Sequence, residues 1–216
     1  MSDPQTPTAP AFEVNINEWL GTTWNLFKQD IVKYAVAGLI AGLVSIVTCG
    51  ILSGPMAVGL YGCFMKKARG GDFEYGDLFN GVKKQFLPSL LFVLAVLVIT
   101  GAISVALAFI PIVGQIASSL IGIVIGPLVS FSLCEIAAAE TTVEIGGLVD
   151  LVKRVFDRIK SQYGMLIVLY LILEIITFLG VLGCCIGVFV TGAFMVLALS
   201  VSYLAIFKAE SPAAQQ

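Results

Sequence analysis

Two glutamates lie inside long apolar stretches of the sequence and are its strongest candidates for chemistry. Glu174 stands among leucine and isoleucine residues, where a charged group in a membrane costs roughly 3 kcal/mol or more. Its side chain is therefore expected to be protonated, paired or facing water, which suits a proton- or cation-coupling site. The alternative is a structural hydrogen bond between helices. The candidate partners for that bond are Tyr61, Thr100, Ser104 and Thr191.

Glu135 is the second candidate transport or coupling residue. It lies nearer the end of its apolar stretch, and Lys66 and Lys67 end another such stretch. This arrangement predicts an ion pair between Glu135 and one of the two lysines at the membrane surface.

Other site chemistries lack the residues they need. The 216-residue sequence has no histidine, which removes Ser-His and Cys-His nucleophiles, HExxH zinc sites and histidine-ligated haem. It has no phosphate loop of the Gly-x-x-x-x-Gly-Lys-Ser/Thr type, and its net charge of -2 gives no basic surface for nucleic acid. We therefore expect a protein that is not an enzyme and that has no metal, cofactor or nucleic-acid partner.

The five cysteines show no Cys-x-x-Cys spacing, so they indicate neither a zinc site nor a redox motif. One interpretation is that they are small apolar packing residues. Cys49 and the pair Cys184-Cys185 fall near predicted outer turns, where a disulfide would form if that side of the membrane is oxidising. Both interpretations stay open at this point.

The composition is that of a protein dissolved in lipid. Hydrophobic residues make up 58% of the chain and charged residues 12%, with a mean hydropathy of +1.00. A helix needs about 20 mostly apolar residues to cross about 30 Å of hydrocarbon. The segments that qualify are 31–48, 51–65, 86–110, 112–134, 163–179 and 183–207. The predicted fold class is an all-α integral membrane protein with six transmembrane helices arranged as three hairpins.

Basic residues fall on one side of these spans. The turns at residues 49–50, 111 and 180–184 carry no charge. The lysines and arginines lie in the other connections or beyond the end spans, except Lys33, which lies at the start of the first span. Short loops rich in lysine and arginine stay in the cytoplasm. Both termini are therefore predicted to be cytoplasmic, with the protein in the plasma (inner) membrane of a bacterium.

The membrane domain, residues 12–208, is predicted to contain three copies of one unit. The copies span about 12–70, 71–141 and 142–208, between a disordered cytoplasmic tail at 1–11 and a C-terminal tail at 209–216. Each copy opens with a glutamate between two apolar residues, followed by an amphipathic helix and two spans.

The amphipathic helices have recognisable ends. Asn15 with Glu18, and Thr141 with Glu144, have the spacing of helix caps. Each amphipathic helix closes with a basic residue and a glutamine. These closing residues are Lys28-Gln29, Lys84-Gln85 and Lys160-Ser161-Gln162.

An amphipathic helix rich in aromatic and basic residues can lie in the lipid headgroup layer. The residues predicted to lie there are Trp19, Trp24, Lys153, Arg154, Arg158 and Lys160. The alternative is that these helices are cytoplasmic extensions of the spans that pack on one another.

Glycine and proline mark the returning span of each unit. Proline removes a backbone hydrogen bond, so Pro55 and Pro127 are predicted helix breaks. Small-xxx-small spacing predicts close contacts between helices. The pairs with this spacing are Gly38 and Gly42, Gly50 and Gly54, and Gly122 and Gly126.

Several motifs give the chain a family resemblance over nearly its whole length. They are Ala68-Arg69-Gly70, Asp77-Leu78-Phe79-Asn80-Gly81, Ile110-Pro111, Leu179-Gly180 and the run 186–191. With them the sequence resembles bacterial six-span YciC-like proteins and the membrane domain sometimes fused to glycerophosphoryl diester phosphodiesterases. The resemblance implies a helical membrane fold and no activity.

The sequence leaves three functional hypotheses. The leading one is a non-enzymatic scaffold or accessory subunit, whose partners are membrane lipids and other membrane proteins or further copies of itself. The second is a small transporter or channel in which Glu174 couples a proton or cation, helped by the helix breaks. The third is a protein that shapes the membrane or binds lipid through its amphipathic helices.

Overall fold

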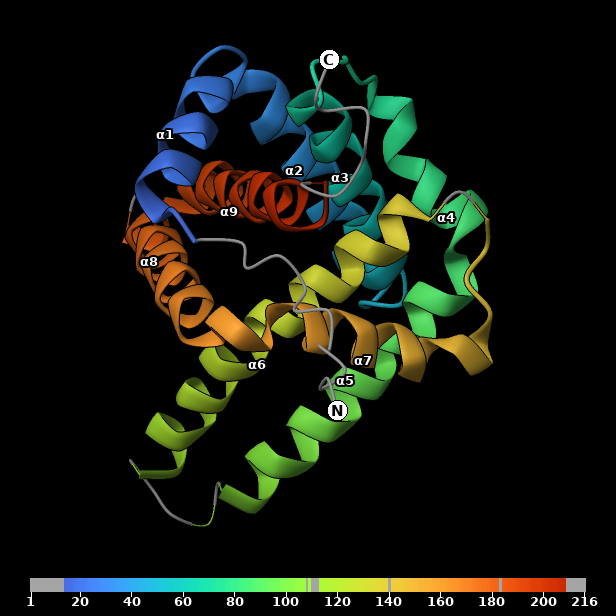
Figure 1. The fold of residues 1–216 in the computed structure, drawn as a ribbon, viewed down its shortest axis with the longest axis vertical. Helices are drawn as coiled ribbons and strands as arrows, with labels where there is room; N and C mark the ends of the chain where they lie inside the picture. The colour runs from blue at the N-terminus through green and yellow to red at the C-terminus, as the bar shows by residue number, and fades with distance from the viewer. Residues whose placement is uncertain (1–13, 108, 110–112, 140, 183, 209–216) are drawn as a thin grey trace, which may run out of the picture.

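The computed structural model describes residues 14–107, 109, 113–139, 141–182 and 184–208 (Figure 1). Over these residues the regular secondary structure consists of helices and contains no strand, which confirms the all-α class. The α-helices are α1 (Ile16–Phe27), α2 (Ile31–Val47), α3 (Ser53–Ala68), α4 (Asn80–Lys84), α5 (Phe86–Leu107), α6 (Val113–Ala138), α7 (Leu148–Ile159), α8 (Tyr163–Leu182) and α9 (Cys184–Lys208). Short 3-10 helices are η1 (Tyr75–Phe79), η2 (Ile145–Gly147) and η3 (Lys160–Gln162).

Within the described residues, four helical runs are long and apolar enough to cross a membrane. They are Phe86–Leu107, Gly114–Ala138, Ile145–Gly180 and Gly187–Phe207. A fifth candidate is α1 with α2, although a 93° bend separates the two helices. With 17 and 16 residues, α2 and α3 are shorter than the span of about 20 residues that crosses a bilayer. The chain is thus an all-α membrane protein with four or five apolar helices of spanning length.

Amphipathic helices precede α2 and α8, as predicted. Asn15 caps α1, because its side chain accepts a hydrogen bond of 3.2 Å from the amide of Glu18. The second predicted cap is wrong. η2 begins after Glu144, and Thr141 contributes its carbonyl oxygen to a hydrogen bond with Gln85 instead.

Consecutive long helices pack in pairs, and the second helix of each pair lies nearest the centre. α3, α6 and α9 contact one another, while α2 packs on α9, α5 on α3 and α8 on α6. The short helices follow the same order, since α1 packs on α9, α4 on α3 and α7 on α6. Each of the three predicted units therefore contacts the second long helix of the predicted unit before it, and the first contacts that of the last.

The core lies where α3, α6 and α9 meet. Buried residues follow one another without a gap over 197–203 of α9 and 130–134 of α6. A buried run longer than the 3.6 residues of one turn means that protein surrounds the helix on every side. By contrast, α5 is largely exposed, since 6% of its most apolar stretch is buried inside the protein. In Figure 1 it projects from the body together with the first half of α6.

Glycines make the closest backbone contacts possible. A Cβ atom on Gly59 of α3 would lie 1.8 Å from the carbonyl oxygen of Leu78. A Cβ atom on Gly81 of α4 would lie 2.1 Å from the carbonyl oxygen of Pro55. Because both close neighbours are backbone atoms, glycine at these two positions lets η1 and α4 lie directly against the backbone of α3.

The small-xxx-small pairs contribute unequally. Gly38 and Gly42 both lie against Phe189 of α9. In the other two pairs only the second glycine is in contact: Gly54 with the backbone of Ser89, and Gly126 with the ring of Tyr170. Space is open where a Cβ would be added at Gly50 and Gly122.

The two prolines differ from the prediction in how they affect their helices. Pro55 is the third residue of α3 and lies in its first turn, where an amide has no partner within the helix. It therefore starts a helix and does not break one. Pro127 lies inside α6, which continues to Ala138. Close to it, the carbonyl of Val124 accepts a hydrogen bond of 2.6 Å from the hydroxyl of Tyr163.

Candidate functional site

Glu174 lies half-buried on α8, one turn after Tyr170, and the two side chains make a polar contact. The ring of Tyr170 crosses to α6, where it covers Gly126 and its hydroxyl contacts Ser130. Ser130 in turn contacts the buried Tyr61 of α3. A row of four polar side chains therefore connects α8, α6 and α3 inside the protein.

The partner of Glu174 in the structure is therefore Tyr170, which is not among the predicted partners. The hydroxyls of Thr100 and Thr191 donate to carbonyls of their own helices at 2.7 and 2.9 Å. Ser104 is exposed. Tyr170 was missed because only bonds between helices were considered. The i, i+4 spacing of Tyr170 and Glu174 is the signal that would have found it.

Glu135 accepts a hydrogen bond from the hydroxyl of Tyr203, which links α6 to α9. The predicted ion pair of Glu135 is wrong, because Lys66 pairs with Asp77 at 3.0 Å and Lys67 pairs with two other aspartates. A neutral donor therefore holds this carboxylate near the end of α6.

An ion-pair network joins the start of α2 to the loop after α3. Asp72 lies 2.7 Å from Lys33 and 3.3 Å from Lys67, and Lys67 also lies 2.9 Å from Asp30. The hydrogen bonds from Lys33 and Lys67 lower the pKa of Asp72 to about 2. Asp72 therefore stays ionised at any physiological pH.

Two glutamines tie distant segments together. Gln85 is 4% exposed, donates to the carbonyl of Thr141 at 2.8 Å and accepts from the amide of Val143 at 3.1 Å. Gln162 accepts from the amide of Val14 at 2.7 Å. The sequence located both glutamines but not their partners, which lie 56, 58 and 148 residues away along the chain.

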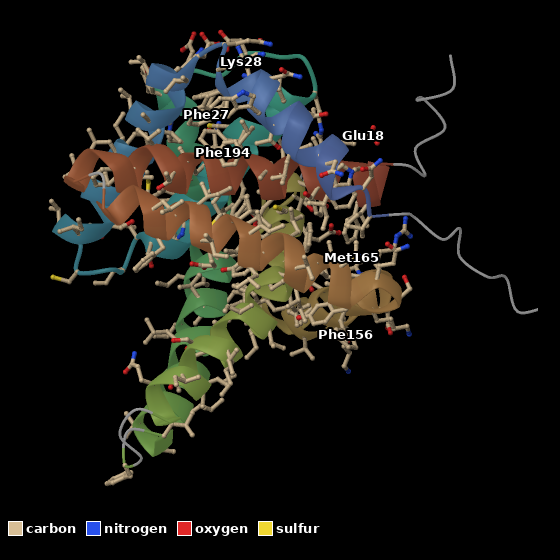
Figure 2. The ribbon with its side chains drawn as sticks, turned by 90° about the vertical axis from the view of Figure 1, so that its left-hand side faces the viewer. Glu18, Phe27, Lys28, Phe156, Met165 and Phe194 are labelled. Carbon is tan, nitrogen blue, oxygen red and sulfur yellow. The ribbon has the colours of Figure 1, made fainter. Side chains whose placement is uncertain are left out.

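The two tryptophans of α1 face opposite ways. Trp19 is 7% exposed and belongs to the core, so its predicted place among lipid headgroups is wrong. Trp24 is 55% exposed, with one ring edge against Phe194 of α9. Figure 2 shows Phe27 and Phe194 facing each other between α1 and α9, with ring centres 5.3 Å apart. α1 is thus held to α9 by aromatic side chains and keeps Trp24 at the surface.

α7 has one buried and one exposed apolar stripe. The buried stripe is Leu151, Val155 and Ile159, and α7 packs on α6. The exposed stripe consists of Val149 and Phe156 of α7 and continues from Ile145 of η2, and Phe156 points outward in Figure 2. Of the predicted headgroup cations, Lys153, Arg154 and Lys160 are exposed, and Arg158 lies over the ring of Phe207 at 5.7 Å. The buried stripe of α7 therefore fits the interpretation that this helix packs on its neighbours. The exposed stripe and the exposed cations fit the interpretation that it contacts lipid headgroups.

Cysteines and metal ligands add no site. In the part of the chain that the structure describes, no cluster of three or more His, Cys, Asp or Glu side chains could hold a metal ion. Cys49 is an exposed free thiol, and Cys63 and Cys134 are buried free thiols. The side chains of Cys184 and Cys185 lie outside the described residues, so a disulfide there stays a prediction.

No known protein family, curated protein or solved structure matches this chain. The resemblance to YciC-like and phosphodiesterase-linked membrane domains therefore stays a prediction.

Proposed function

We propose that the chain is a six-span protein of the bacterial inner membrane, with both termini in the cytoplasm, built from three related units closed into a ring. The cyclic order of helix contacts supports the ring, because each unit packs on the one before it and the first on the last. The charge distribution supports the orientation. In Figure 2 the outer ends of α5 and α6 lie at the lower left, opposite the labelled Glu18 and Lys28.

Within that architecture the chain serves as a scaffold or accessory subunit and has no catalytic role. The observation that carries this proposal is the packing of α3, α6 and α9 at the centre. Buried residues continue without a gap over 197–203 and 130–134, so side chains fill the space where a conduction path along the axis would need water. A filled centre suits a protein that presents its outer surface to lipids and to other membrane proteins.

Extraction in mild detergent followed by reconstitution tests this proposal. We expect a membrane-protein partner, or further copies of the chain, to co-purify in a fixed ratio. Liposomes that contain the purified protein should then leak protons no faster than empty liposomes, as measured with a trapped pH-sensitive dye. A proton or solute flux that depends on the protein would refute the scaffold role.

A second candidate function is transport coupled to Glu174. It is favoured by the row of polar side chains that runs from Glu174 through Tyr170 and Ser130 to Tyr61, since such rows accompany proton transfer in membranes. If flux is found, Glu174→Gln should abolish it. Thr177→Val is the matched control, because its hydroxyl bonds within α8 to the carbonyl of Leu173 and lies outside the row.

A third candidate is binding to anionic membranes through α7, favoured by its exposed apolar stripe beside exposed cations. It predicts a preference for anionic over neutral vesicles. Replacing Lys153, Arg154, Arg158 and Lys160 with glutamine should remove that preference, and an unchanged preference would eliminate this candidate.

A further inference from the structure

We infer that a cavity between α3, α4 and the C-terminal end of α6 binds a phosphate group. The inference stands apart from the scaffold role, because it concerns a small ligand and not a partner protein. It uses neither of the intramembrane glutamates.

The cavity has the size of a small group. It encloses 220 Å³ and is lined in part by Gly59, Gly62 and Gly81. A second cavity of 310 Å³ adjoins it, and the two share Gly62, Lys66 and Ala137 in their walls. Pockets for drug-sized ligands run from about 300 to 1,000 Å³. The first cavity is smaller than this range and the second lies at its lower limit, so the site suits a compact ion or headgroup better than a large organic molecule.

Positive charge dominates the walls. Lys66 lines both cavities, Lys84 lines the first and Arg69 lines the second. Asp77 is the acidic residue among the described lining residues, and it is paired with Lys66 at 3.0 Å. Lys84 and Arg69 have no ion-pair partner within the described residues. Among the described lining residues, three cations thus face one carboxylate, which leaves the cavity walls with a net positive charge.

Phosphate is the anion that matches these donors. Lysine ammonium groups and the arginine guanidinium donate several hydrogen bonds to phosphate oxygens, with the planar fork of arginine able to donate two at once. A carboxylate ligand would have fewer acceptor oxygens for three cationic side chains. The same phosphate could come from a lipid headgroup or from a soluble ion.

The backbone places Lys84 at this cavity. Gly81 and Gly59 let α4 approach α3 so closely that a Cβ on Gly81 would lie 2.1 Å from the carbonyl oxygen of Pro55. Lys84 is one turn of α4 beyond Gly81, so its side chain starts from a fixed position beside α3. The neighbouring Lys83 is exposed, as Lys84 is, but it is not part of the lining, which makes it a matched control.

Calorimetric titration of the full-length protein in an uncharged detergent tests the site. One arm uses dihexanoyl phosphatidylglycerol and the other uses inorganic phosphate. Each cation near bound anionic lipid contributes about 1 kcal/mol, which at 1.4 kcal/mol per tenfold is a change of about fivefold in affinity. We expect Lys84→Gln and Arg69→Gln each to weaken binding by about fivefold. Lys83→Gln should leave binding unchanged.

Asp77→Asn provides a test in the opposite direction. It removes the negative charge from the cavity and frees Lys66, so binding should become tighter. If the lipid binds and inorganic phosphate does not, the site takes a lipid headgroup. If inorganic phosphate also binds and Lys84→Gln weakens its binding as much as that of the lipid, the site takes a soluble anion. The inference is overturned if neither ligand binds, if Lys83→Gln weakens binding as much as Lys84→Gln, or if Asp77→Asn weakens it. Unchanged gel-filtration profiles of the variants exclude misfolding as the cause.

Discussion

Gly59→Ala should destabilise the protein through one added methyl group, because α3 and the segment leading into α4 meet backbone to backbone at this residue. The new Cβ would lie 1.8 Å from the carbonyl oxygen of Leu78, and ordinary contact begins at 3.4 Å. The two segments must therefore separate by about 1.6 Å, the difference between those distances. No flexible side chain is available to give way.

The magnitude follows from two opposing effects. Overpacking a close-packed region costs about 1–3 kcal/mol, and a backbone neighbour places this residue at the upper end. Alanine in place of glycine within a helix stabilises the fold by about 0.5–1 kcal/mol. The net loss is about 2 kcal/mol, or about 4–8 °C in Tm for a chain of this size.

Gly62→Ala is the matched control on the same helix. A Cβ at Gly62 has nothing within 4 Å, so only the helix-propensity gain applies and Tm should rise by about 1–4 °C. Both variants can be measured by far-UV circular dichroism of the detergent-solubilised protein during heating. A Tm of Gly59→Ala at or above that of the wild type would refute the close contact between α3 and the start of α4.

Three further changes test other contacts. Tyr203→Phe leaves Glu135 without its donor and should cost about 1–3 kcal/mol, so an unchanged Tm would contradict that hydrogen bond. Gln85→Leu leaves the amide of Val143 without its acceptor and should speed hydrogen exchange there, whereas an unchanged rate would mean that the loop is held elsewhere. Asp72 has its pKa lowered to about 2, so its ion pairs stabilise the fold above its ordinary pKa of 3.8, and that stabilisation is lost as the pH falls through about 2. At neutral pH the Tm of Asp72→Asn should therefore be lower than that of the wild type, and below about pH 2 the two Tm values should be equal. A difference in Tm that persists below about pH 2 would contradict the ion pairs.

Helix positions could be predicted closely from the sequence. The predicted spans 86–110 and 112–134 correspond to α5 at Phe86–Leu107 and α6 at Val113–Ala138. The agreement arises because the length of an apolar run is a local property. The predicted span 51–65 begins two residues before α3. Pro55 was predicted to break this helix, but it lies in the first turn, where proline fits.

The orientation of side chains was harder to predict. Trp19 and Trp24 belong to one amphipathic helix, and the hydrophobic pattern assigned both to the membrane surface. Tertiary packing decides between them, because Trp19 joins the buried core whereas Trp24 stays 55% exposed even with a ring edge against Phe194 of α9. A periodic pattern identifies a face but does not say whether protein or lipid will cover it.

The alternation of uncharged stretches with clusters of positive charge could be read along the chain, because the cost of placing each residue in lipid adds up segment by segment. The meeting of polar groups could not be read in this way. Gln162 and the amide of Val14 are 148 residues apart, and Glu135 and Tyr203 are 68 apart. Such bonds exist only once helices dock, since the crossing of two helices, and not the composition of either one, brings a donor to its acceptor.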